Sequence, residues 1–148
     1  MKLKIVKAKE KDLRKIAEIY KEEFSKPPYN ESWTVQKAMG KIRLFCKAST
    51  FYDTYKIEYG NEIIGFIVIN KNIWSPGFIF FIEEFALKSG FQGRGFGGDT
   101  LNYIEKQYKK RGFRTAMLLS LKKSKSNSIY RKLGYQKSRG QTLFEKSL

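Results

Sequence analysis

Histidine is absent from this 148-residue chain, and cysteine occurs once, as Cys46. Without histidine the chain cannot form a histidine-based catalytic triad or most kinds of zinc site. A single cysteine excludes an internal disulfide and a cysteine metal cluster, so no metal is expected. Cys46 lies in an apolar helical pattern with no histidine to activate its thiol. We therefore expect it to be packed and not to act as a nucleophile.

Long apolar runs are also missing. No segment is apolar over the length that a bilayer requires, and the N-terminus lacks the apolar centre of a signal peptide. We therefore expect a cytoplasmic protein with no membrane partner. The hydrophobic content is 41% and the aromatic content 16%, which is typical of a folded protein. At this length we expect one domain over residues 1–148.

Acidic residues are scarce beside basic ones. There are 14 Asp and Glu against 30 Lys and Arg, which gives a formal net charge of +16. Such a charge attracts polyanions, whether nucleic acid, acidic lipid or a phosphorylated ligand. A solvated lysine-rich surface with no specific partner explains the same number equally well, so charge alone selects no function.

The apolar periodicity predicts a mixed α/β (α+β) domain with the order β-α-α-β-β-β-α-β-α-β. Proline follows the first helix and ends it, and a turn is expected at Ser75–Gly77. The expected strands are 3–6, 51–59, 63–70, 79–87 and 115–121, with one or two more from Tyr135 onward; the expected helices are 10–24, 35–47, one from the glycine cluster to about residue 111, and 124–133.

The most informative segment is residues 80–98, which read FFIEEFALKSGFQGRGFGG. An apolar strand carrying the pair Glu83 and Glu84 is followed by a glycine-rich turn and then by helical periodicity. Where the residues at a helix N-terminus are glycines, no side chains cover the free backbone N–H groups, and these groups form a favourable site for phosphate. The segment therefore predicts a phosphorylated ligand held close to a buried carboxylate.

Three nucleotide motifs resemble the glycine cluster in part. A dinucleotide fingerprint fits Gly93-x-Gly95-x-x-Gly98 but needs an acidic residue about 20 positions later, where this chain has lysines. An RNA-recognition strand needs further aromatic residues after the second glycine, where Gly98 and Asp99 stand. A P-loop is excluded because no Gly-Lys-Ser/Thr follows.

A family resemblance fits better. Residues 92–97, QGRGFG, match the Q/R-x-x-G-x-G/A signature of the GCN5-related N-acetyltransferases (GNAT). The preceding IEEFAL is similar to the central strand of that superfamily, and IYRKLGY at 129–135 resembles its second signature. The segment PPYNESW at 27–33 resembles a stretch between the first helices of some members. The resemblance covers nearly the whole chain and implies a mostly antiparallel central sheet flanked by helices.

The resemblance implies an acetyl-CoA-dependent enzyme that transfers an acetyl group from the thioester to a primary amine by direct attack. It assigns the pyrophosphate to the backbone of the glycine turn, and the pantetheine arm to backbone groups of the preceding strand, with the Leu87 amide as donor to the thioester carbonyl. The cofactor residues so implied are Gln92, Gly93, Arg94, Gly95, Phe96, Gly97 and Gly98 for the turn, and Phe85, Ala86 and Leu87 for the strand.

Two catalytic residues follow from the same resemblance. Glu83 matches a carboxylate that removes the amine proton, and a buried carboxylate should have a raised pKa. Tyr130 matches a tyrosine that protonates, or hydrogen-bonds to, the departing thiolate. The family often has asparagine seven positions before this tyrosine, where this chain has Lys123 and where Asn127 is out of register. Lys122, Lys123 and Lys125 either meet the 3′-phosphate of CoA or are surface residues.

The expected acceptor residues are Tyr29, Glu31 and Trp33 in the loop between the first two helices, together with Glu84 on the opposite strand face from Glu83. An aromatic and acidic lining suits a cationic amine; the net charge favours an acidic peptide, ribosomal or nucleotide-bearing acceptor instead. A homodimer is compatible with the resemblance. The competing hypothesis is a non-catalytic basic module that binds nucleic acid on a degenerate acetyltransferase fold.

Overall fold

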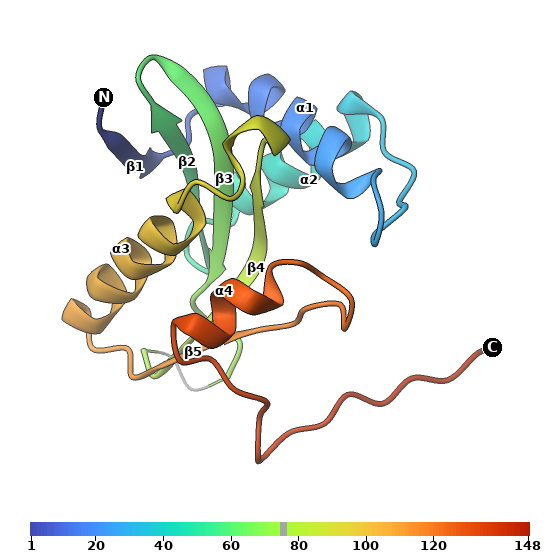
Figure 1. Cartoon of the computed structure of the whole chain (residues 1–148), viewed down its shortest axis with the longest axis vertical. Coiled ribbons are helices and arrows are strands. Elements are labelled where there is room, and N and C mark those ends of the chain that lie inside the picture. The colour runs from blue at the N-terminus through green and yellow to red at the C-terminus, as the bar shows by residue number, and fades with distance from the viewer. Residues whose placement is uncertain (75–76) are drawn as a thin grey trace.

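A computed structural model of the chain describes residues 1–74 and 77–148 (Figure 1). Five strands form one sheet in the order β1-β2-β3-β4-β5, with antiparallel pairing except between β4 and β5. The elements are β1 (Leu3–Lys7), α1 (Leu13–Phe24), α2 (Val35–Lys47), β2 (Tyr52–Tyr59), β3 (Glu62–Asn70), β4 (Ile79–Leu87), α3 (Phe96–Lys110), β5 (Thr115–Leu118) and α4 (Asn127–Lys132), with short 3₁₀ turns at Glu10–Asp12 and Ser89–Phe91.

The sheet is covered on both faces, and its middle strand shows why. Residues 64–69 of β3 are all buried, as a continuous apolar run predicts for a strand with no solvent-facing side. Phe66 and Val68 pack with α1 and α2, whereas Ile67 and Ile69 pack on the other face with α3 and the partly buried side chains of α4. The period of two along β3 therefore divides the interior into two apolar cores. Figure 1 shows the two helix pairs on either side of the sheet.

Local hydrogen bonds fix the starts of the first two helices. The carboxylate of Asp12 accepts the Lys9 N–H at 2.9 Å at the entry to α1. The Thr34 hydroxyl accepts the Lys37 N–H at 3.1 Å and caps α2. Both helices then pack their apolar residues against the sheet, in the core that contains Phe66 and Val68 of β3.

A buried charge cluster around Asp53 joins strands β1, β2 and the end of β3 to the end of α3. Asp53 on β2 is 4% exposed and accepts hydrogen bonds from Arg111 at 2.9 Å and from Lys71 at 3.1 Å. Lys7 and the Tyr108 hydroxyl also bind this carboxylate. Burial alone raises the pKa of a carboxyl, but here the four donors outweigh it and hold the pKa of Asp53 below its ordinary value. Asp53 is therefore ionised and links β1, β2, the end of β3 and the end of α3.

The mixed, mostly antiparallel sheet flanked by helices confirms the predicted fold class. The observed bounds of α2 and β4 equal the predicted ones. The turn expected at Ser75–Gly77 falls largely on residues 75–76, which lie outside the described part of the chain.

The prediction was wrong at the C-terminal end. No strand forms in residues 133–148, all of which are described, and the segment from Gln136 onward is exposed and extends away from the sheet (Figure 1). Apart from the terminal Leu148, its large apolar residues are Leu143 and Phe144, which are adjacent and would point to opposite faces of a strand, so neither face can bury a stripe. β5 stops at Leu118 and not at residue 121, and turns hydrogen-bonded through Ser124 delay α4 to Asn127.

Candidate active site

The backbone of β4 is unpaired on one edge over its second half. Pairing between β4 and β5 ends at Ile82 opposite Leu118, while β4 stays paired with β3 as far as Leu87. The Lys88 N–H donates to the Ile64 carbonyl of β3 at 2.8 Å. Since backbone groups of successive residues point to opposite edges of a strand, Phe85 and Leu87 present theirs to the open edge, whereas those of Ala86 face β3. The result is a strip of free backbone beside the sheet.

The glycine turn continues this strip. Gly93 and Gly95 have φ values of +72° and +87°, a region that favours glycine, and a side chain at either position would point into open space. In the described chain, residues 93–98 donate no backbone hydrogen bond to another backbone group. Several N–H groups therefore stand free at the start of α3, where the helix dipole is positive. This cradle fits a pyrophosphate.

Side chains hold the turn in place. The Gln92 amide donates to the Leu87 carbonyl at 2.7 Å and to the Glu23 carboxylate of α1 at 3.0 Å. The same carboxylate accepts the Ser89 N–H at 3.1 Å. Gln92 thus joins the turn to β4 and α1 by hydrogen bonds. Because it occupies the Leu87 carbonyl, the Leu87 N–H is the backbone group of this residue that stays available at the open edge.

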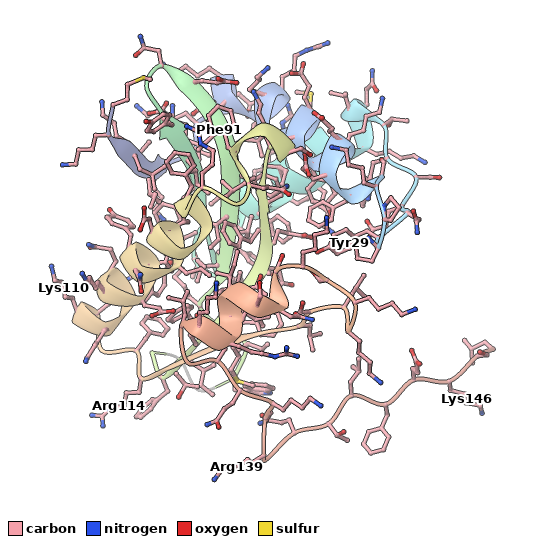
Figure 2. The ribbon with its side chains drawn as sticks, in the orientation of Figure 1. Tyr29, Phe91, Lys110, Arg114, Arg139 and Lys146 are labelled. Atoms are coloured by element: carbon pink, nitrogen blue, oxygen red, sulfur yellow. The ribbon has the colours of Figure 1, made fainter. Side chains whose placement is uncertain are left out.

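Arg94 is the one cation within the turn. Its guanidinium carbon lies 5.1 Å from the centre of the Phe96 ring, 5.3 Å from that of Phe91 and 5.9 Å from that of Tyr59. Phe91 is labelled in Figure 2 above the start of α3. Cation–π contacts hold a guanidinium in place without neutralising it. The positive charge of Arg94 is therefore kept at the cradle, and Phe96 contributes its ring as well as its backbone.

Glu83 occupies an irregular position on β4. Val68 of β3 pairs with Glu84 and the next β3 residue, Ile69, pairs with Ile82, so Glu83 is an extra residue in a β-bulge. Burial raises the pKa of its carboxyl, and the adjacent charge of Glu84 adds to the rise; the Asn70 side chain and Lys41 oppose it but do not cancel it. A half-buried carboxylate with a raised pKa is suited to accept a proton.

Glu84 is engaged by the chain itself. Its Oε1 lies 2.6 Å from the Lys41 Nζ of α2 and accepts the Tyr20 hydroxyl of α1 at 3.1 Å. Lys41 also donates to the Tyr20 oxygen at 2.8 Å. The sequence interpretation identified Tyr20 only as a core residue and missed Lys41, because no local pattern indicates that three separate elements meet there.

The expected acceptor residues of the α1–α2 loop lie next to this group. The Trp33 ring lies 4.8 Å from that of Tyr20, and its N–H donates to the Glu31 carboxylate. Tyr29 packs edge-on against Phe24 at 4.9 Å. Figure 2 shows Tyr29 at the end of the loop after α1 that comes nearest to α4.

Tyr130 closes the site from α4. Burial, followed by the effect of the Tyr29 phenol, raises the pKa of Tyr130 to about 12, so its hydroxyl stays protonated at neutral pH. The effect of the Tyr29 phenol on Tyr130 places α4 beside the α1–α2 loop, and the neighbouring Ile129 side chain lies with Phe85 and Leu87 around Gly97, at the open edge of β4. Asn127 does not replace the missing asparagine, since its amide donates to the carbonyls of Leu121 and Lys122 and so holds the turn before α4.

The basic charge is concentrated at the C-terminal end. Residues 109–148 contain 12 of the 30 Lys and Arg but one of the 14 Asp and Glu. Lys110, Arg114, Arg139 and Lys146 in Figure 2 lie in the lower part of the molecule, away from the α1–α2 pair.

Among the described residues no cluster of three metal-ligating side chains is found, and no described helix has the length and apolar content to cross a bilayer. Burial raises the pKa of the half-buried Cys46 thiol, as expected for a packed cysteine.

Comparisons with known proteins agree with this geometry. The model of the acetyltransferase (GNAT) family matches residues 13–135. Similar solved structures include a protein of Clostridium difficile 630 described as a possible acetyltransferase, with a TM-score of 0.82 and 14% identity over 99% of this chain and 97% of that one.

Two further similar structures hold bound ligands, and the second is described as an aminoglycoside acetyltransferase. AAC(6')-Iy in complex with a bisubstrate CoA analogue has a TM-score of 0.75 and 13% identity, with 100% of both chains covered. The meta-AAC0020 enzyme of an uncultured soil metagenomic sample, in complex with sisomicin, has a TM-score of 0.67 and 16% identity over 99% of this chain and 96% of that one. Identities this low establish a shared fold and no more. No curated protein matches the chain.

Proposed function

Because the chain belongs to the acetyltransferase (GNAT) family, we propose that it is an acetyl-CoA-dependent N-acetyltransferase acting on a primary amine. The observation that carries this function is the open edge of β4, which runs directly into the glycine turn. The turn holds the pyrophosphate on the free N–H groups of residues 93–98, and the backbone of Phe85 and Leu87 pairs with the pantetheine arm. Acetyl-CoA supplies an activated acetyl thioester at the end of that arm.

The Leu87 N–H stabilises the negative charge that develops on the thioester oxygen. The Leu87 carbonyl already accepts a hydrogen bond from the Gln92 amide, and the Leu87 N–H is directed at the open edge of β4. Backbone donors held by sheet pairing need no reorganisation when charge develops, which is the condition for strong electrostatic stabilisation.

Glu83 removes the proton of the incoming amine, directly or through water, so that the nitrogen lone pair attacks the acetyl carbon. The C–N bond forms, the C–S bond breaks, and the electron pair leaves on sulfur. Tyr130, with its pKa raised to about 12, is a weaker acid than an ordinary thiol of pKa about 8.5. Tyr130 therefore donates a hydrogen bond to the departing thiolate and keeps its own proton.

The acceptor binds beside the α1–α2 loop, which carries Tyr29, Glu31 and Trp33 and which meets the Glu84 group through the contact of Trp33 with Tyr20. This lining favours a small cationic amine, and the name of one structural neighbour places aminoglycosides on the panel to be tested. Peptide amines belong on the same panel. We assign the reaction to the cytoplasm.

The uneven charge favours a second candidate function, a basic module that binds nucleic acid through residues 109–148. Thermal-shift measurements with acetyl-CoA, CoA and a short DNA duplex separate the two. Stabilisation by both CoA species, followed by CoA release with a member of the amine panel, supports the enzyme. Stabilisation by DNA alone would refute it.

A further inference from the structure

Glu84, Tyr20 and Trp33 together form a binding site for an ammonium group (the seat), and the Lys41 side chain occupies it. The Lys41 Nζ lies 2.6 Å from the Glu84 carboxylate and 2.8 Å from the Tyr20 oxygen, and it lies 5.2 and 5.3 Å from the centres of the Tyr20 and Trp33 rings. A carboxylate combined with two aromatic faces is the chemistry by which proteins bind ligand ammonium groups. The residues come from α1, the α1–α2 loop, α2 and β4, so tertiary structure alone assembles the seat.

The seat lies next to the expected point of reaction. Glu84 follows Glu83 directly in β4, and the Lys41 charge acts on the Glu83 carboxyl as well. Glu84 has a side-chain exposure of 13%, but that of Lys41 is 36%. The seat is thus closed on the sheet side and open to solvent on the side from which Lys41 enters.

We propose that Lys41 is a specificity-determining residue that occupies this seat in place of a substrate cation. This role rests on the proposed function. An acceptor whose reacting amine lies at Glu83 cannot place a second ammonium group on Glu84, because that carboxylate is already neutralised. The enzyme therefore gains nothing from a second positive charge at this position, and each amine group of a diamine should react no faster than the amine of a monoamine of equal length.

Chemical rescue tests the seat without turnover. In Lys41→Ala, n-butylammonium chloride should bind where the lysine side chain was and raise the melting temperature by about 4–5 °C near tenfold excess over its Kd. Butanol at the same concentration should not. Wild type and Lys47→Ala should not respond to either compound beyond sodium chloride of equal ionic strength; Lys47 lies on the same helix and has no ion pair in the described chain. An equal butylammonium response in wild type, Lys41→Ala and Lys47→Ala would overturn the proposal that this site binds an ammonium group.

Kinetics test the consequence for specificity. For wild type, kcat/KM for 1,4-diaminobutane should be about twice that for butylamine, the factor expected from two equivalent amines. In Lys41→Met the ratio should rise about tenfold, as the new charge-assisted hydrogen bond to Glu84 predicts. Lys41→Met/Glu84→Gln should lose the gain. A Lys41 that merely anchors α2 would change stability in these variants and leave the ratio unchanged.

The outcomes also separate this role from the proposed function. CoA release with the same diamine ratio in wild type and Lys41→Met would overturn the role of Lys41 alone. If Lys41→Met does not fold, the same ratio of kcat/KM for diamine over monoamine is measured in Lys41→Gln and in wild type. A wild-type ratio of about ten or more would overturn the claim that Lys41 keeps a second ammonium group away from Glu84. CoA release by none of these proteins with any amine of the panel would overturn the proposed function, while butylammonium rescue would still report on the seat.

Discussion

Replacing Glu83 by glutamine gives the sharpest test of the catalytic assignment. The substitution keeps the size and shape of a half-buried side chain and removes only its capacity to accept a proton. Burial and the charge of Glu84 raise the pKa of this carboxyl above its ordinary 4.5, toward the pH at which a base works best. Neutralising a carboxylate in such a place should not weaken the fold.

The expected loss follows from the role. A positioned general base contributes about 10²- to 10⁴-fold, and transfer through water favours the lower end. We therefore expect kcat to fall about 10²-fold, which corresponds to about 2.7 kcal/mol of transition-state stabilisation. The Kd of acetyl-CoA should stay within about twofold, because Glu83 supplies no group to the cradle.

The assay is CoA release followed from acid to alkaline pH. The wild-type rate should rise with pH through the raised pKa of Glu83, since only the ionised form accepts a proton. Glu83→Gln should lose this acid limb and keep the limb that belongs to the amine. Glu62→Gln, an exposed hairpin residue, should behave as wild type. A Glu83→Gln enzyme with an unchanged acid limb and a rate within about threefold of wild type would refute the assignment.

Three further predictions concern other parts of the structure. Tyr130→Phe should lower kcat about tenfold or more and leave acetyl-CoA binding intact, whereas Tyr135→Phe, which loses a hydrogen bond to Glu105, should affect stability and not turnover. Gly95→Ala, at φ +87°, should cost about 1 kcal/mol of stability and weaken acetyl-CoA binding in calorimetry; Gly90→Ala, where φ is ordinary and space is open, should not. Asp53→Asn should cost about 3–5 kcal/mol in thermal or denaturant unfolding. Because the folded pKa of Asp53 is depressed, wild-type stability from this group is present above about pH 4 and lost below it, and the variant should lack that part of the acid dependence. Equal turnover of Tyr130→Phe, equal binding by Gly95→Ala or an unchanged acid profile of Asp53→Asn would each contradict the role given.

The sequence was most informative where a local pattern determines the local structure. The apolar run of β4 and the glycines after it form a strand, a turn and a helix start within residues 79–98, and the predicted bounds of β4 equal those observed. The cradle could be predicted because positive φ angles and free N–H groups depend on glycine and on the helix start, both of which are readable from the chain.

The rest depends on contacts between distant segments. The seat of Lys41 joins residues from α1, α2 and β4, and nothing near Lys41 in the sequence indicates its partner. The bulge at Glu83 was also not predicted, because strict alternation gives Glu83 and Glu84 opposite faces without an extra residue. The missing C-terminal strand was the reverse error: the β-prone residues from Tyr135 onward have no apolar stripe on one face that pairing with the sheet could bury.

Amide hydrogen exchange with and without acetyl-CoA tests the central claim most directly, which is that the open edge of β4 and the glycine turn form one acetyl-CoA site. Saturating acetyl-CoA should slow exchange at the amides of Phe85 and Leu87 and across residues 93–98, with little change in residues 136–148. Exchange that stays unchanged at Leu87 and in the turn, or protection confined to the basic C-terminal residues, would contradict it.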